Sequence, residues 1–259
     1  MVRNATNRGF AAAVNQGFSA LHTPFVLLLN PDAQVTEGLE ALRAACSLPG
    51  AAGAGGRLID NRKHPQVGFM VRGLPTATAL ILEVLLLNRI WPNNPVNRRY
   101  RGLQLNYNMR IPVEQPAGAF LMVRRSVWLE LGGFDEGFFP LWFEDVDFCR
   151  RAANHGYCFY YVPDAAALHK GGHSIAHLSV ENRRVYWYGS LLRYSAKHFR
   201  PIAFRALCLA VVAGSLLRSL GEAVLTGSLK PLPVYGKVIR RAGRCFLFGW
   251  EDGVVTSSA

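Results

Sequence analysis

The stretch that decides the fold class is Phe25-Val26-Leu27-Leu28-Leu29-Asn30-Pro31-Asp32. Five apolar residues in a row, followed at once by Asn-Pro-Asp, are typical of a strand that is buried on both faces and ends in a loop. Residues 9–20 before it and residues 37–46 after it predict short helices. Helix, buried strand, helix is the alternation of an α/β sheet, in which ligands bind at the carboxyl ends of the strands. Asn30 and Asp32 are therefore expected at a ligand-binding edge.

The same reading extends along the chain. A Gly/Ala-rich stretch over 49–56 leads into a short expected strand, and residues 76–87 predict an apolar helix. Residues 118–123 predict a strand, and residues 126–131 predict a helix that stops at a pair of glycines. We predict an α/β fold with a Rossmann-like, mixed and mostly parallel sheet flanked by helices. The expected division is a catalytic domain over 1–180 and a basic, apolar helical region over 181–259.

Charge is distributed unevenly in this chain of 259 residues, half of which are apolar. Lys and Arg outnumber Asp and Glu by 29 to 17, and 12 of the cations but only 4 of the acids follow Val180. Such an excess indicates an anionic partner, whether phospholipid headgroups, nucleic acid or a phosphorylated substrate, with a merely solvated basic surface as the alternative. The region contains no nucleic-acid-binding motif, so we expect an anionic membrane surface and no nucleic acid.

The cysteines and the amino-terminal residues bear on location. Five scattered cysteines without a CxxC pair favour a reducing compartment and argue against a zinc site. Residues 1–10 contain two arginines and no apolar run of signal-peptide length. We expect a cytoplasmic protein, peripheral at the inner face of the plasma membrane.

The apolar segment 202–225 leaves two interpretations open. Its longest uncharged run, residues 206–217, has 12 residues, whereas a membrane-spanning helix needs about 20. Arg205 and Arg218 bracket this run, and long arginine side chains can reach the interface from a helix that lies in the membrane surface. A helix packed on the enzyme is the equal alternative.

Two acidic clusters follow apolar sequence. Asp32 ends the first run, and Glu144, Asp145 and Asp147 follow the aromatic residues 138–143. Carboxylates in such surroundings suit either a ligand of Mg²⁺ or Mn²⁺ or a general base with a raised pKa. The structural alternatives are a helix N-cap for Asp32, a solvated loop or helix start for Glu144-Asp145, and a satisfied core histidine for His169.

Six blocks, in this order and spacing, carry a resemblance. They are Asn7-Arg8-Gly9-Phe10-Ala11-Ala12-Ala13-Val14-Asn15-Gln16-Gly17, Leu29-Asn30-Pro31-Asp32, Gly118-Ala119-Phe120-Leu121-Met122-Val123-Arg124-Arg125, Gly132-Gly133-Phe134-Asp135-Glu136-Gly137-Phe138-Phe139, Trp142-Phe143-Glu144-Asp145-Val146-Asp147-Phe148-Cys149-Arg150-Arg151, and Gly156-Tyr157 with Pro163-Asp164-Ala165 leading to His169. Over residues 7–174 the chain resembles family 2 glycosyltransferases, in particular the rhamnosyltransferase-like and galactofuranosyltransferase-like members.

The resemblance implies a GT-A-type fold and an inverting, metal-dependent transfer of a sugar from a nucleoside diphosphate. It implies that Asp32, with Asn30 beside it, binds Mg²⁺ or Mn²⁺ on the donor diphosphate and that His169 completes the metal site. It further implies that Asp145 is the general base and that Glu144 orients the acceptor. The residues that it places at the donor or acceptor are Asn7, Gly9, Asn15, Asn30, Gly118, Ala119 and Trp142.

The chain departs from the family pattern at its beginning. Family members start with two strands that bind the base and ribose of the donor, and this chain starts after both, so we expect an incomplete nucleotide-binding half. A βαβ unit takes about 30 or more residues. Two hypotheses follow: a transferase acting on a polysaccharide or lipid-linked acceptor, with rhamnose as the first candidate sugar, or an inactive remnant that keeps only an acceptor-binding cleft.

Overall fold

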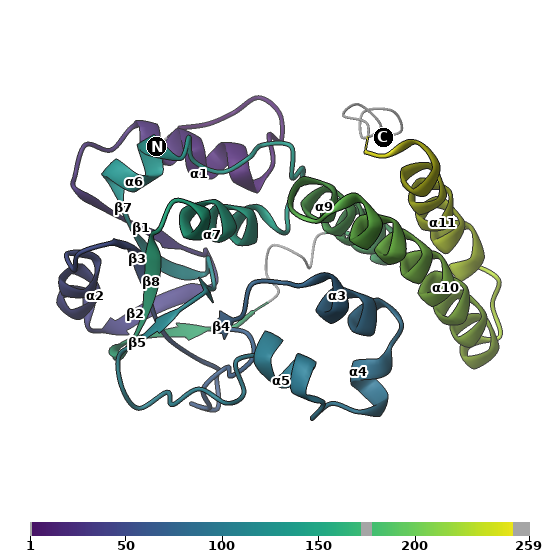
Figure 1. Ribbon diagram of the computed structural model, residues 1–259. Coiled ribbons are helices and arrows are strands. Elements are labelled where there is room, and N and C mark those ends of the chain that lie inside the picture. The colour runs from purple at the N-terminus through teal and green to yellow at the C-terminus, as the bar shows by residue number, and fades with distance from the viewer. Residues whose placement is uncertain (1, 172–177, 251–259) are drawn as a thin grey trace. The chain divides into compact units, whose positions relative to one another are not determined.

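The computed structural model describes residues 2–171 and 178–250 (Figure 1). In chain order its elements are α1 (Phe10–Ser19), β1 (Phe25–Leu29), β2 (Ala33–Glu37), α2 (Leu39–Cys46), β3 (Ala51–Ile59), β4 (Val71–Arg72), α3 (Ala77–Val84), α4 (Leu87–Ile90), α5 (Pro95–Tyr100), β5 (Ile111–Val113), β6 (Gln115–Pro116), β7 (Phe120–Arg124), α6 (Arg125–Glu130), α7 (Glu144–Asn154), β8 (Cys158–His169), α9 (Val180–His198), α10 (Pro201–Thr226) and α11 (Pro231–Phe248).

The main sheet is mixed. Its strand order is β1-β7-β3-β8-β2, β5 also pairs with β8, and β4 pairs with β6 in a separate ribbon. β1, β3 and β8 run in the same direction, but β7 lies antiparallel between β1 and β3. The α/β class, the mixed sheet and the flanking helices are confirmed. The strands pair in both senses: β3–β8 is the parallel pair among the described strands, and the other pairs of the main sheet are antiparallel. β1 differs from the prediction that its apolar run is buried on both faces: it lies at one end of the strand order, Val26 is its one buried residue, and Leu29 is 36% exposed.

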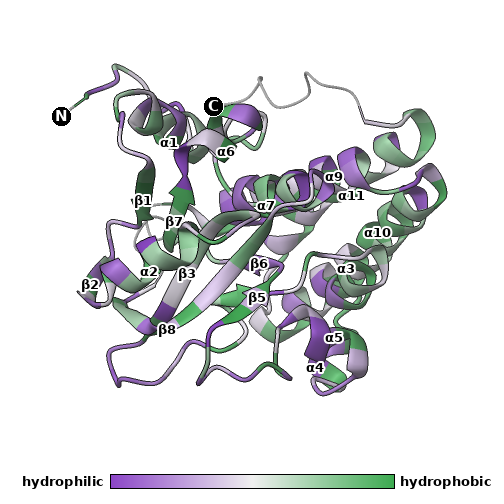
Figure 2. Ribbon diagram, turned by 60° about the vertical axis from the view of Figure 1, so that its left-hand side comes forward, coloured by the Kyte–Doolittle hydropathy of each residue, from purple (hydrophilic) through white to green (hydrophobic). Residues whose placement is uncertain are grey.

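Helices cover both faces of this sheet. On one face, α2 contributes Leu42, Ala45 and Cys46 to a core that includes Phe120 and Met122 of β7. On the other face, α1, α6 and α7 pack against the alternate residues of β7, Leu121 and Val123. Side chains alternate across a strand, so one strand supplies both cores. In Figure 2 the helices around β7 carry both hydrophilic and hydrophobic residues, as expected of helices with one side on a sheet and one in water.

Residues 51–56 of the Gly/Ala-rich stretch are themselves part of β3, so the stretch does not lead into a later strand. A Cβ at Gly56 would lie 2.3 Å from Cε1 of Phe120 and 2.6 Å from the carbonyl oxygen of Ala165. At Gly53 it would lie 2.4 Å from the carbonyl oxygen of Met122. Small residues are therefore required because the backbones and rings of β7 and β8 approach β3 closely, a tertiary demand that overrides strand propensity.

The predicted helix over 37–46 is shorter in the structure. α2 begins at Leu39, because residues 33–37 form β2 against β8. Asn30-Pro31-Asp32 therefore leads into a strand. The alternative interpretation of Asp32 as a helix N-cap is wrong.

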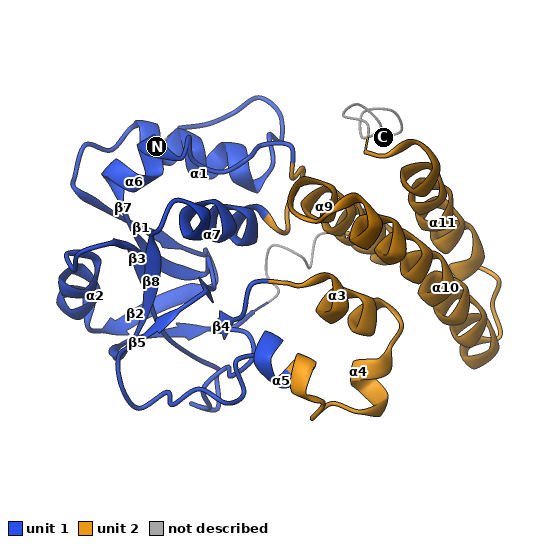
Figure 3. Ribbon diagram, in the orientation of Figure 1, with its two compact units in different colours: residues 1–74, 98–137, 144–177 blue, residues 75–97, 138–143, 178–259 orange. Residues whose placement is uncertain are grey.

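The chain divides into two compact units (Figure 3). The first comprises 1–74, 98–137 and 144–177 and contains the main sheet; the second comprises 75–97, 138–143 and 178–259 and contains α3, α9, α10 and α11. The second unit resumes near the expected boundary at residue 180. The sequence did not indicate that 75–97 and 138–143 cluster with it.

Among the described residues, α10 is the one helix long and apolar enough to cross a membrane, although nearly half of its most apolar window is buried.

Candidate active site

One edge of the main sheet gathers the predicted polar residues. β1, β3 and β8 end at this edge, and β7 and β2 begin there. The N–H of Asn30, one residue past β1, donates to the carbonyl oxygen of Ala119, one residue before β7, over 3.0 Å. His169, the last residue of β8, is paired with Ala33, the first residue of β2. The carboxyl ends of strands are where α/β sheets bind ligands.

Asp32 and His169 are brought together by this pairing of β2 with β8. His169 Nε2 lies 3.6 Å from Asp32 Oδ1, and only 5% and 7% of the two side chains are exposed. The two side chains therefore face each other out of contact with bulk water. An ion with ligand distances of about 2.0 to 2.2 Å can bind two atoms at this separation.

The far side of the His169 ring is fixed. Its Nδ1 lies 2.9 Å from Gln66 Oε1, and Gln66 Nε2 donates to the carbonyl oxygen of His169 over 2.8 Å. With the amide oxygen as acceptor, Nδ1 carries the proton and the Nε2 lone pair faces Asp32. Phe69 stacks on the ring at 5.2 Å between centroids. Burial lowers the pKa of His169, and the nearby Asp32 carboxylate opposes that shift. A neutral imidazole held from behind is the usual state of a metal ligand.

The chemistry of this donor set fits a divalent cation. One carboxylate oxygen and one imidazole nitrogen suit Mn²⁺ and are compatible with Mg²⁺. Across residues 2–171 and 178–250, no group of three or more His, Cys, Asp or Glu side chains gathers around one point. The pair could supply two ligands to such an ion, which would leave positions open for phosphate oxygens and water.

Asp145 meets the backbone just before β7. Its Oδ2 accepts a hydrogen bond from the N–H of Gly118 over 3.2 Å and lies 3.4 Å from Gln115 Nε2, while its Oδ1 accepts from the N–H of Val146 over 2.8 Å. A Cβ on Gly118 would lie 3.3 Å from Oδ2, so the glycine is what permits this approach. Burial raises the pKa of Asp145, while the hydrogen bonds from Gly118 and Val146 and the charge of Arg72 lower it.

Glu144, the neighbouring residue at the start of α7, has different surroundings. It is buried, and its Oε2 has no hydrogen-bond partner. Burial first, and then the adjacent Asp145 carboxylate, raise the pKa of Glu144 well above its ordinary value. The two carboxyl groups are therefore separated in acidity: Asp145 ionises first because backbone donors stabilise its charge, and Glu144 stays protonated longer.

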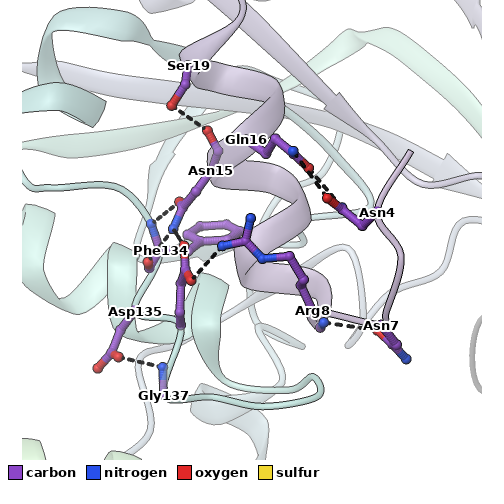
Figure 4. Close-up of polar contacts among 11 residues, drawn as sticks. Asn4, Asn7, Arg8, Asn15, Gln16, Ser19, Phe134, Asp135 and Gly137 are labelled. Carbon is purple, nitrogen blue, oxygen red and sulfur yellow. Dashed lines mark hydrogen bonds and ion pairs between the residues drawn. The ribbon is translucent and has the colours of Figure 1, made fainter. Parts of the chain in front are cut away.

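Asn15 and Asn7 form contacts within the chain (Figure 4). Asn15 Nδ2 donates to the carbonyl oxygen of Phe134 over 2.9 Å and to Glu136 Oε1 over 3.0 Å, and Asn15 Oδ1 accepts from the N–H of Phe134 over 2.9 Å. The N–H of Gly9 donates to Asn7 Oδ1 over 2.9 Å, in a turn that precedes α1. The amide of Asn15 thus joins α1 to the 132–137 turn, and the expected contact of Asn15 with donor or acceptor stays a prediction.

Comparisons with known proteins show the family of the chain. The model of the family described as Glycosyl transferase family group 2 matches residues 101–238. Over 229 residues the chain is 31% identical to the N-acetylglucosaminyl-diphospho-decaprenol L-rhamnosyltransferase of Mycobacterium tuberculosis, which covers 76% of this chain and 71% of that relative. The chain belongs to glycosyl transferase family group 2.

Other relatives of this glycosyltransferase were found. The rhamnosyltransferase WbbL of Escherichia coli K12 is 35% identical over 86 residues, which is 33% of this chain and 31% of that relative. Among solved structures, the mannosyltransferase PcManGT from Pyrobaculum calidifontis, in complex with GDP-Man and Mn²⁺, is 14% identical, covers 96% of this chain and 70% of that chain, and gives a TM-score of 0.46.

Asp147, the third acid of the 142–151 block of this glycosyltransferase, is held within the fold. Asp147 is fully buried, and its Oδ2 accepts from Arg151 Nε over 2.7 Å. Arg151 in turn donates to the carbonyl oxygens of Leu131 and Gly133. Asp147 therefore fixes the turn at the two glycines through Arg151, and it is not available as a base.

Trp142 lies in the 138–143 segment, which clusters with the second unit of the glycosyltransferase. Its φ is 79° and that of Phe143 is 71°. Left-handed backbone is unfavourable for bulky residues and is often found at functional turns. The sequence assigned Trp142 to ligand contact, and that assignment stays a prediction.

Several residues around the site of the glycosyltransferase were missed by sequence reasoning. They are Gln66 and Phe69 behind His169, and Arg72 and Gln115 beside Asp145. Arg72 of β4 is paired in register with Gln115 of β6, its Nε donates to the carbonyl oxygen of Gly68 over 2.8 Å, and its guanidinium lies over Tyr100. These residues come from 60–116, where the sequence has no clear periodicity.

Proposed function

We propose that this glycosyltransferase inverts the anomeric centre of a nucleoside-diphosphate sugar while transferring it to a polysaccharide or lipid-linked acceptor in the cytoplasm, peripherally at the inner face of the plasma membrane. Rhamnose is the first candidate for the sugar. The observation that carries the proposal is the sheet edge itself. It presents the Asp32–His169 pair next to the Asn30–Ala119 contact, and Asp145 against Gly118.

Asp32 and His169 would hold a divalent cation. Such an ion, when bound, supplies positive charge that stabilises the departing nucleoside diphosphate. Gln66 fixes the imidazole so that Nε2 points at the ion site, and β2 fixes Asp32 by its pairing with β8. Asn30 lies two residues away, at the start of the same loop.

Asp145 accepts the proton of the attacking hydroxyl. In the transfer step the acceptor oxygen forms a bond to the anomeric carbon, the bond from that carbon to the diphosphate oxygen breaks, and the hydroxyl proton moves to the Asp145 carboxylate. One displacement from the opposite face inverts the anomeric centre. The partly raised pKa of Asp145 suits a base, because a carboxylate stabilised too strongly would hold a proton poorly. Glu144 would orient the acceptor through a hydrogen bond to Oε2, and the lack of a partner on that oxygen supports this role.

The choice of rhamnose and of a lipid-linked acceptor is supported by two relatives. One is an N-acetylglucosaminyl-diphospho-decaprenol L-rhamnosyltransferase and the other is a rhamnosyltransferase. Small contacts in a pocket decide between sugars, so the donor must be measured.

The test is a donor screen with Mn²⁺ and a lipid-diphosphate acceptor, run on this chain and on the chain extended by any upstream coding sequence in frame. We expect nucleoside diphosphate release that depends on the acceptor and the metal, with a product of inverted configuration by NMR. Acceptor binding without nucleotide release from any donor would instead establish an inactive acceptor-binding module.

A second arm of the test examines the metal site. Asp32→Asn should raise the Mn²⁺ concentration needed for donor binding, because it removes a ligand charge. Gln66→Leu should weaken metal affinity by about 10- to 100-fold, the usual effect of removing a residue that orients a ligating histidine. Unchanged Mn²⁺ titrations in both variants would contradict the assignment of Asp32 and His169.

A further inference from the structure

Two of the three charged residues of α10, Arg218 and Glu222, are turned inward. Arg218 donates to the hydroxyl of Tyr188 over 2.8 Å and to the carbonyl oxygen of Glu83 over 3.1 Å. Glu222 pairs with Arg184 at 2.8 Å and accepts from the hydroxyl of Tyr235 over 2.7 Å. All of these partners belong to the second unit. The polar side of α10 is thus directed at α3, α9 and α11.

The opposite side of α10 is apolar and exposed. We call it the α10 outer face, and its members are Ile202, Ala206, Leu209, Ala213, Leu216, Leu217, Leu220, Val224 and Leu225. The large side chains among them are between 49% and 86% exposed. The spacing of seven and four residues places most of them along one stripe of the helix. Arg205 is the only charged residue of α10 that is exposed. A water-facing helix normally shows the reverse pattern, and α10 is coloured as apolar over much of its length (Figure 2).

The charge around this face points to one kind of partner. Residues 201–248 contain seven cations and a single acid, Glu222, which is already paired. On α11 the exposed residues include Arg240 and Arg244, followed by the exposed Leu247 and Phe248, while the exposed Lys237 is paired with Glu181 at 2.7 Å. Apolar side chains beside cations match a bilayer that contains anionic lipids. A second copy of the chain would bring the same cations toward each other.

The contacts of α10 also distinguish lying on a membrane from crossing it. A spanning helix would be surrounded by lipid, yet Arg218 and Glu222 are held by α9, α11 and the end of α3 along the same helix. Removing those partners would leave two charges in hydrocarbon, which is costly. Only the outer face is free to contact lipid.

We propose that the α10 outer face inserts into the surface of an anionic membrane, with the helix axis in the membrane plane and the cations of α11 contacting headgroups. The proposal deepens the proposed function, since a lipid-linked acceptor is presented at such a surface. Its test needs no sugar donor, so it can fail while the transferase activity stands.

The experiment is flotation of the full chain with vesicles of phosphatidylcholine alone and of phosphatidylcholine with 30% phosphatidylglycerol. We expect binding to the anionic vesicles, weakened by salt. Leu220→Glu should lower the partition coefficient at least tenfold, because a carboxylate replaces an inserting side chain and repels the surface. The matched control is Leu129→Glu on α6, since Leu129 and Leu220 are 56% and 60% exposed, and it should bind as the wild type does.

The cations are tested separately. Arg240→Gln and Arg244→Gln should each lower binding to the anionic vesicles by about fivefold at low salt. Arg43→Gln, an exposed change on α2, should not alter binding.

Three results would overturn the proposal. One is binding of Leu220→Glu at the wild-type level. Another is resistance of the bound chain to alkaline carbonate extraction, which indicates a spanning helix. The last is a wild-type dimer in sedimentation velocity that Leu220→Glu dissociates while vesicle binding is unchanged, which assigns the face to a second copy.

Discussion

At the residue scale, the site depends on two adjacent carboxyl groups in unlike environments. Asp145 has backbone N–H donors from Gly118 and Val146, and Glu144 has an oxygen without any hydrogen-bond partner. A base must be ionised before the reaction, and a group that orients an acceptor can act while protonated. In the proposed mechanism, the same helix turn therefore supplies two different functions.

Asp145→Asn should lower the turnover number by about 10²- to 10⁴-fold, the usual contribution of a positioned base. Donor binding should persist, because the amide keeps the acceptor oxygen for the Gly118 N–H. Steady-state kinetics and donor titrations check both parts. Asp164→Asn, an exposed position on β8, serves as the control and should leave turnover unchanged. Near-normal turnover of the Asp145 variant would move the base to Glu144.

Arg72→Gln should shift the acidic limb of the pH profile of kcat/KM to higher pH. The charge of Arg72 lowers the pKa of Asp145, so its removal raises that pKa and leaves the base protonated up to a higher pH. Arg72→Lys should keep most of the effect, because it keeps the charge. A profile that is lower at every pH but not displaced would indicate that Arg72 contributes only to packing over Tyr100.

At the element scale, the sequence predicted those helices and strands that local sequence patterns determine. The runs that became β1, β7, α1, α6 and α10 have apolar periodicity or clear stop signals, and the structure contains each of them. The expected contact of Asp32 with His169 came from a resemblance, and the structure shows the β2–β8 pairing that produces it.

What could not be predicted depends on partners distant in sequence. β3 has a composition of glycine and alanine because β7 and β8 approach it, and no local signal reports that approach. Gln66 and Arg72 lie in irregular sequence, and only the folded chain brings them to His169 and Asp145. Strand direction was also undetermined, since burial on both faces is compatible with either direction.

Gly56→Ala tests this close approach. The added methyl would lie 2.3 Å from the Phe120 ring and 2.6 Å from the carbonyl oxygen of Ala165. Because a backbone atom cannot yield as a side chain can, we expect a loss of about 1–3 kcal/mol or more in the free energy of unfolding, measured by urea denaturation. Gly17→Ala in α1 has no atom within 4 Å of the added methyl and should stabilise the chain by about 0.4–1 kcal/mol. Equal effects of the two changes would contradict the packing explanation.

At the scale of the whole molecule, the active site lowers the stability of the fold at neutral and higher pH. The pKa of Glu144 is well above its ordinary value of 4.5. The folded chain therefore holds a proton that the unfolded chain releases. The stabilisation from that proton is complete below pH 4.5 and is lost as the pH rises through the folded pKa. The proposed role of Glu144 at the acceptor therefore comes with a lower free energy of unfolding at neutral and higher pH.

Glu144→Gln should remove this pH dependence. Glutamine is nearly isosteric with the protonated acid and cannot ionise, so the unfolding free energy of the variant should fall less steeply with rising pH than that of the wild type. The difference in slope is at most about 1.4 kcal/mol per pH unit for one proton. Urea denaturation between pH 5 and 9 measures it, and the titration of His169 cancels because it is common to both proteins. Glu40→Gln, whose side chain is 80% exposed in the wild type, should leave the slope unchanged. Parallel curves for Glu144→Gln and the wild type would show that Glu144 is ionised in the folded chain with an ordinary pKa, and it could not then remain protonated beside an ionised Asp145.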